Sequence, residues 1–339
     1  MARLYVYVLL ALCFVRPAQA DASLGDLVAA HQAAPNSEQA TGRLEASVSA
    51  GLPAEVKPGW LDALPVNSTS LSYDLGTLIV PRAYLPTHAE EPQHQWKFSK
   101  VVYVYLPQDK TLAQFCAVHY SGEANQTLAV RVARLLSLAH HTLVTNTGHE
   151  AANGTAPFDV WLCAGGQNGG EQWRSNLYLY TVDTPRSSIE WIREIVHEYS
   201  HLALPAVGGY TAPEYWANGY LGERLLVRWF MRDTDGPKKV EYAWGDFSGA
   251  PNFTRLLIAP ALALYKKVGP SKVWLARKDE VGMRYFIGQA LTFDDKYGAK
   301  RLGDALARLP HFRTATATDF AAALTETLSA SNTVSNKLP

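Results

Sequence analysis

A pair of histidines four residues apart constrains this chain more than any other feature. His197 and His201 flank the residues Glu198-Tyr199-Ser200. In an α-helix, residues four apart project from one face, so both imidazoles could hold one zinc ion. Glu198, one position on, could accept a proton from water that the ion has acidified. The alternative interpretation is a chance coincidence on an ordinary helix.

The residues around this pair predict the helix that such a metal site needs. Ser187 and Glu190 have the spacing of a capping box, and Pro205 cannot continue a helix, so one is expected over residues 187–203. A second capping box is formed by Thr211 and Glu214, and it predicts another helix that continues to about residue 231. Apolar residues follow helical spacing in the first segment: Ile189, Ile192, Ile195, Val196 and Tyr199.

Strand and helix signals divide the chain into an alternating part and a helical part. Strands are expected at residues 101–105, 158–162 and 176–182, with a helix at 127–144 between the first two. Further helices are expected at 256–268, 281–297, 300–309 and 318–328. We therefore predict an α+β fold, with a mixed sheet and the histidine helix in residues 67–205 and a mostly helical subdomain in residues 206–330.

The first 20 residues have the pattern of a cleavable export signal. Arg3 is followed by an apolar run over residues 4–15 and by the small-residue site Ala18-Gln19-Ala20. A membrane anchor is the alternative, but the run is shorter than the roughly 20 apolar residues that a spanning helix needs. Residues 21–66 are interpreted as an extension or pro-segment, with a packed helix pair as the alternative. The mature protein is expected to be secreted, with no integral membrane segment.

Composition bounds the possible partners. The formal net charge is zero, so the basic excess typical of a nucleic-acid-binding protein is missing. Cys116 and Cys163 would remain after signal cleavage, either as one disulfide or as two buried thiols. Four glycosylation sequons favour a secretory glycoprotein: Asn67-Ser68-Thr69, Asn125-Gln126-Thr127, Asn153-Gly154-Thr155 and Asn252-Phe253-Thr254.

Over roughly residues 100–328, the sequence resembles the gluzincin branch of the HExxH metallopeptidases, specifically the peptidase-MA-like group. The motif at 197–201 carries the resemblance, and Tyr285-Phe286-Ile287-Gly288-Gln289-Ala290 and Tyr297-Gly298 follow the group's helical pattern. The resemblance implies a zincin-like fold and a strand, here at residues 176–180, whose edge pairs with substrate. It also implies a third zinc ligand in a segment of the form Trp-Leu-x-Glu-Gly.

The third ligand departs from that pattern. In the matching segment Pro213-Glu214-Tyr215-Trp216-Ala217-Asn218-Gly219-Tyr220, Asn218 stands where the group has Glu. An uncharged amide would hold zinc less tightly, and replacing Asn218 with Glu should then tighten binding. Glu214 could substitute, although a role as the capping acid is at least as consistent. Glu223 is roughly 140° around the helix from Asn218, so it is expected to be a solvated acid unless the register shifts.

A donor that stabilises the oxyanion is also implied by the resemblance. Tyr285 is the candidate, although a core aromatic is the favoured interpretation of that residue. These features predict a secreted zinc metallopeptidase that acts on a peptide or protein, with Glu198 as general base and His197, His201 and Asn218 as ligands. The alternative is a non-catalytic exported protein that keeps the fold as a binding module, which the replacement at Asn218 motivates.

Overall fold

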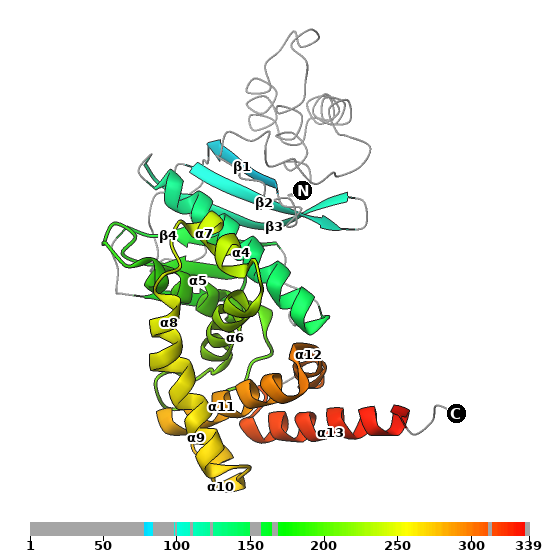
Figure 1. Cartoon of the computed structure of the whole chain (residues 1–339). Helices are drawn as coiled ribbons and strands as arrows, with labels where there is room; N and C mark the ends of the chain where they lie inside the picture. Colours follow the sequence, from blue (N-terminus) through cyan, green and yellow to red (C-terminus); the bar gives the residue numbers. More distant parts are fainter. Residues whose placement is uncertain are drawn as a thin grey trace, which may run out of the picture. The chain divides into compact units, whose positions relative to one another are not determined.

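The computed structural model describes residues 78–83, 98, 100–108, 111–122, 125–149, 157–164, 169–310 and 314–335. It is a mixed α+β protein, as predicted (Figure 1). Contacts divide the chain into two compact units, one comprising Met1–Ala133 with Ala156–Asp159 and the other Arg134–Thr155 with Val160–Pro339. The predicted signal at 1–20, the extension at 21–66 and the sequons at Asn67 and Asn153 lie outside the described residues.

The first unit contains an antiparallel meander. Strand β1 (Leu78–Ala83) pairs with β2 (Lys100–Gln108), which pairs with β3 (Thr111–Tyr120), and a bulge between Val104 and Tyr105 shifts the second register. The β-branched run predicted as a strand forms β2, and Val101, Val102 and Val104 are fully buried. This strand was predicted from composition, whereas β1 and β3 were not.

Strand β4 (Phe158–Leu162) begins in the first unit and continues into the second, where β6 (Asn176–Leu179) lies between β4 and β5 (Gly170–Trp173). The β5–β6 pairing is antiparallel, with Glu171 opposite Tyr178. All four residues of β6 are buried. The expectation that residues 176–180 carry a free edge is therefore wrong, because both sides of β6 are paired and the edge belongs to β5.

Helices make up most of the second unit (Figure 1). The sequence predicted α4, α5, α9, α11 and α12 close to their observed bounds and α13 with its C-terminal end seven residues too early, whereas the short helices α7, α8 and α10 were missed. Their bounds are α4 Gln126–Thr147, α5 Ser188–Ala203, α6 Asn218–Arg232, α7 Gly236–Trp244, α8 Ala250–Phe253, a π-helical turn Thr254–Ile258, α9 Ala259–Val268, α10 Lys272–Leu275, α11 Glu280–Tyr297, α12 Ala299–Leu306 and α13 Ala317–Ser335.

Helices α5 and α6 pack against each other at short range. A Cβ placed on Gly222 would lie 1.9 Å from the Ser200 Oγ atom, so only glycine permits this approach. Both helices belong to one compact unit, which continues across the subdomain boundary drawn after residue 205 from the sequence. The close contact fixes what α6 can present to the histidines of α5.

The two cysteines are free and buried. Burial raises the pKa of both thiols, and the nearby Asp159 charge adds to the effect at Cys116. The interpretation of Cys116 and Cys163 as two buried thiols is therefore confirmed, and the alternative of a disulfide is not. Among the residues that the structure describes, every helix falls short of the length and apolar character needed to cross a bilayer.

Candidate metal centre

Helix α5 positions the histidine pair as the sequence predicts. Ser187 and Glu190 form the complete capping box, and the helix ends at Ala203. His197 and His201 lie one turn apart near its C-terminal end, with their Nε2 atoms facing each other at 3.2 Å. Their rings meet edge to face, with centroids 4.9 Å apart. Two ring nitrogens this close can share one proton or one cation.

Glu214 reaches the same point from a loop. Helix α6 begins at Asn218, so the helix predicted from Thr211 is wrong over its first turns, and the second capping box does not form. The loop brings the Glu214 Oε1 atom to 3.4 Å from His197 Nε2 and 3.5 Å from His201 Nε2. Of the alternatives left open for this residue, the capping role fails and the role as a metal ligand is geometrically available.

These three atoms fit a small divalent cation. Ligand atoms about 2.0–2.2 Å from a tetrahedral zinc ion are roughly 3.3–3.5 Å apart, which matches the 3.2, 3.4 and 3.5 Å observed here. Among the described residues, His197, His201 and Glu214 are the group of three donors that could bind a metal ion. The residues present therefore fit a metal, and the distances alone do not identify which one.

Two further observations mark the space between these atoms. The Oε1 atom of Glu214 is buried and has no hydrogen-bond partner, which is costly unless a ligand satisfies it. Gly219 faces the same space, because a Cβ there would lie 2.4 Å from His201 Nε2 and 2.6 Å from His197 Nε2. The absence of a side chain at this position keeps the space open.

Glu223 supports His197 from the opposite side of the ring. Its Oε2 atom is 3.1 Å from His197 Nδ1, and the residue is fully buried rather than solvated as expected. Its other oxygen accepts a 2.7 Å hydrogen bond from Arg224 Nη1. Burial by itself would raise the pKa of Glu223, but the Arg224 charge and the contact with His197 outweigh it and lower the pKa. Glu223 is thus an ionised group that orients the imidazole.

Asn218 supports His201 in the corresponding way. Its Oδ1 atom is 3.2 Å from His201 Nδ1, on the side of the ring away from the three converging atoms. Its amide nitrogen donates to the carbonyl oxygens of Ser200 and His201 in α5 and of Leu204 just after it, at 3.4, 3.3 and 3.2 Å. The structure therefore places this residue behind His201, and not beside the Nε2 atoms where the prediction had put it as the third ligand.

Charge around the pair polarises the two imidazoles differently. Burial alone would lower the pKa of His197, but the carboxylates of Glu214 and Glu223 on either side raise it to about 10. Burial and the neighbouring His197 charge lower the pKa of His201 to about 4. The two carboxylates thus favour positive charge at this point.

Glu198 is buried beside strand β5. A Cβ on Gly170 would lie 2.7 Å from the Glu198 Cγ atom, so the glycine at the start of β5 makes room for this side chain. Burial raises the pKa of Glu198 to about 8, and the nearby Glu194 carboxylate adds to the effect while His197 opposes it. A carboxylate in this setting is a stronger base than an exposed one.

The structure does not support Tyr285 as the donor to the oxyanion. Tyr285 is fully buried, and its hydroxyl donates to Gly269 O at 2.6 Å and accepts from Ser271 N at 2.9 Å, so it is a structural residue. Tyr220 lies beside the histidine pair instead, with its ring centroid 4.6 Å from that of His197. Burial and the charges of Glu214 and Glu223 raise the pKa of Tyr220 to about 12, which keeps its hydroxyl a donor. The sequence held a signal for Tyr220, because this residue ends the segment that resembles the third-ligand region, directly after Asn218-Gly219.

Comparison with protein-family models gives no match to this chain, and comparison with curated proteins gives none either. The functional interpretation consequently depends on the arrangement of these side chains.

Proposed function

We propose that this protein is an exported zinc-dependent peptidase with a zincin-like fold of the gluzincin type. In this proposal His197, His201 and Glu214 hold the metal, and Glu198 is the general base. The observation that carries the proposal is the convergence of two Nε2 atoms and one carboxylate oxygen at 3.2–3.5 Å. The glutamate next to the first histidine on the same helix completes the set of groups for hydrolysis.

Each surrounding residue has a defined task in the reaction. A bound zinc ion would supply a Lewis acid that acidifies water and polarises a carbonyl. Glu198 accepts the proton of the attacking water and delivers it to the leaving amine. Tyr220 donates its hydroxyl proton in a hydrogen bond to the developing oxyanion. Glu223 and Asn218 hold the Nδ1 sides of the imidazoles, which directs the Nε2 lone pairs into the site.

Glu214 also bears on the non-catalytic alternative. That alternative was motivated by the loss of a charged ligand at Asn218. A carboxylate from the loop restores two imidazoles and one carboxylate, which is a ligand set found in catalytic zinc sites. The charge that zinc needs is thus available without a carboxylate at residue 218, and hydrolysis is the function that this geometry supports best.

The test combines metal content with peptide hydrolysis in the purified full chain. The parent should bind one zinc ion and cleave members of a mixed peptide library. Glu198→Gln should keep the zinc and lose roughly 10²–10⁴-fold in kcat/KM, because only the proton carrier is removed. Glu241→Gln, which changes an exposed acid on α7, is the matched control and should behave like the parent. Normal turnover by Glu198→Gln would refute the mechanism, and a zinc-loaded parent that cleaves nothing would favour the binding module.

A further inference from the structure

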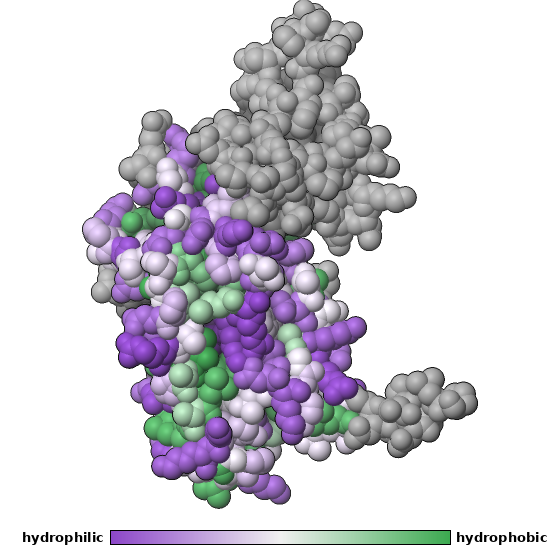
Figure 2. Space-filling model, viewed as in Figure 1, coloured by the Kyte–Doolittle hydropathy of each residue, from purple (hydrophilic) through white to green (hydrophobic). Residues whose placement is uncertain are grey.

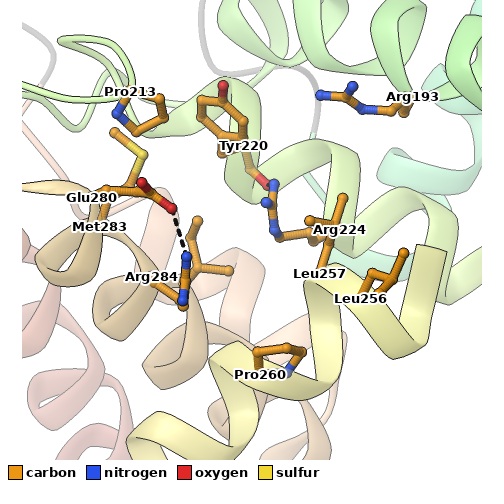
Figure 3. Close-up of a pocket in the computed structure, with 11 residues that line it drawn as sticks. Arg193, Pro213, Tyr220, Arg224, Leu256, Leu257, Pro260, Glu280, Met283 and Arg284 are labelled. Carbon is orange, nitrogen blue, oxygen red and sulfur yellow. Dashed lines mark hydrogen bonds and ion pairs between the residues drawn. The ribbon is translucent and has the colours of Figure 1, made fainter. Parts of the chain in front are cut away.

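A cavity adjoins the metal centre. Its volume is about 390 Å³, and its lining includes Pro213, the residue before Glu214, and Tyr220, whose ring contacts His197. Figure 3 shows the residues that surround it. A substrate held at the metal centre would thus have part of its chain beside or inside this cavity.

Three arginines line the cavity, and two of them are already neutralised. Arg284 Nη2 donates to the Glu280 Oε1 atom at 2.5 Å, within the lining itself (Figure 3). Arg224 donates to the buried Glu223 carboxylate at 2.7 Å and lies 5.0 Å from the centroid of the Tyr220 ring. These contacts leave the two guanidinium groups with partners of opposite charge.

Arg193 has no such close partner. Its Nε atom is buried without a hydrogen-bond partner, and its ion pair is a long one, 3.7 Å to the Glu223 Oε2 atom. That carboxylate is shared with Arg224 and His197, so one buried acid faces two arginines and a histidine. In Figure 3 the Arg193 guanidinium extends toward Tyr220. The residues that line the cavity therefore carry more positive than negative charge, with three arginines against Glu280, and the Arg193 Nε donor has no hydrogen-bond partner.

Part of the lining is apolar. Leu256, Leu257 and Pro260 form this apolar wall, and Leu256 is 52% exposed. Figure 2 shows apolar side chains gathered over the α8–α10 segment to which these residues belong. A ligand suited to this cavity would combine an anionic group with a short apolar stem, as a carboxylate-bearing residue does.

We propose that this cavity, here called the arginine pocket (Arg193, Arg224 and the apolar wall), binds a carboxylate of the substrate. The carboxylate belongs either to an acidic side chain near the scissile bond or to the end of the peptide. The planar guanidinium of Arg193 matches a carboxylate in two-point geometry. The substrate role rests on the proposed peptidase function, whereas binding of the carboxylate does not require turnover.

The experiment measures binding by calorimetry in the metal-free full chain and in zinc-loaded Glu198→Gln. The probes are N-acetyl-Ala-Glu-Ala amide, with a side-chain carboxylate, N-acetyl-Ala-Gln-Ala acid, with a terminal one, and N-acetyl-Ala-Gln-Ala amide, with neither. We expect one of the carboxylate probes to bind about tenfold or more tightly than the neutral probe, as for a charge-assisted hydrogen bond. The probe that is preferred identifies the source of the carboxylate.

Matched variants locate the binding. Arg193→Gln should abolish the preference, and Arg193→Lys should keep only part of it, because a single ammonium cannot make the two-point contact. Arg301→Gln, on the exposed face of α12, should leave it unchanged. Equal binding of all three probes, or a preference that survives Arg193→Gln, would overturn the assignment. A preference that depends on Arg193 in a protein without peptidase activity would keep the arginine pocket and reject the proposed function.

Discussion

Two segments of this chain share one sequence signature and fold differently. Ser187 with Glu190, and Thr211 with Glu214, both have the spacing of a capping box. In the first, the Ser187 N–H donates to the Glu190 carboxylate at 2.9 Å, and helix α5 begins there. In the second, Thr211 N–H donates to Lys278 O at 2.7 Å, and Glu214 lies at the histidines. The signature is local, so it decides the structure only where no tertiary contact competes.

The competing contacts in the second segment are specific. Gly208 forms an isolated bridge with Trp216, and the Ala217 N–H donates to Val207 O at 2.7 Å. Tyr210 N–H donates to Tyr215 O at 3.2 Å. Together these bonds close residues 207–217 into a loop that leads directly into α6. A glutamate that caps a helix in the first segment is here free to face the two histidines.

The largest expected difference between the two signatures is in the zinc affinity of variants that replace their glutamates. Glu214→Gln should weaken zinc binding on the order of a hundredfold or more, about 3 kcal/mol, because the charged ligand becomes a neutral one. Glu190→Gln should leave the affinity unchanged, since its carboxylate serves the helix end. Competition with a chromogenic chelator measures both values. Equal zinc affinities of these two variants would mean that the second signature has no metal-binding role.

The start of α6 provides the next prediction. Asn218→Asp should destabilise the protein by about 2 kcal/mol, because a carboxylate cannot donate to the three backbone carbonyls and would lie beside them as an unpaired charge. Asn218→Glu should leave zinc affinity no tighter than in the parent, which reverses the expectation from the sequence alone. Urea unfolding and zinc affinity test these outcomes, and tighter zinc in a stable Asn218→Glu protein would restore Asn218 as the ligand position.

Gly219 tests the space between the three donor atoms. Gly219→Ala should reduce zinc affinity about tenfold or more while the protein stays folded, since its Cβ would lie 2.4 Å from His201 Nε2. Circular dichroism verifies the fold and chelator competition gives the affinity. An unchanged affinity in the folded variant would place the ion elsewhere.

The smallest expected effect is the difference in unfolding free energy between variants of the two hydroxyl residues, Ser187 and Thr211. Ser187→Ala should cost about 1 kcal/mol of unfolding free energy, as for a lost helix cap. Thr211→Ala should cost less, within about 0.5 kcal/mol, because its Oγ1 makes only an exposed 3.1 Å bond to Lys278 O. Denaturant titration of both variants measures this. Equal losses would indicate that Thr211 does cap a helix in solution.

Helix α5 was predictable because its cap, its apolar period and its terminating proline all agree with the tertiary structure. Strands β2 and β4 were predictable from β-branched and aromatic runs. Strand β5 was not, because its four half-buried residues, Gly170–Trp173, contain no alternating apolar pattern. The place of Glu214 depends on the bonds that close residues 207–217 into a loop and on the Thr211–Lys278 bond, neither of which the capping spacing encodes.

The burial of Glu223 could have been found. Gly219, Gly222, Glu223 and Leu226 recur at helical spacing, so they share one face of α6. Two glycines on that face indicate close packing against another helix, and an acid among them is therefore buried and in need of a partner. The partner was His197, one of the two histidines that are the strongest feature of the sequence.

The central claim is that Glu214, from the failed capping signature, completes the metal site with His197 and His201. Anomalous X-ray diffraction at the zinc edge, on crystals of the zinc-loaded full chain, tests it most directly. The account predicts one zinc peak about 2.0–2.2 Å from His197 Nε2, His201 Nε2 and a Glu214 oxygen. A peak coordinated by Asn218 or Glu223, or a peak away from the two histidines, would contradict it.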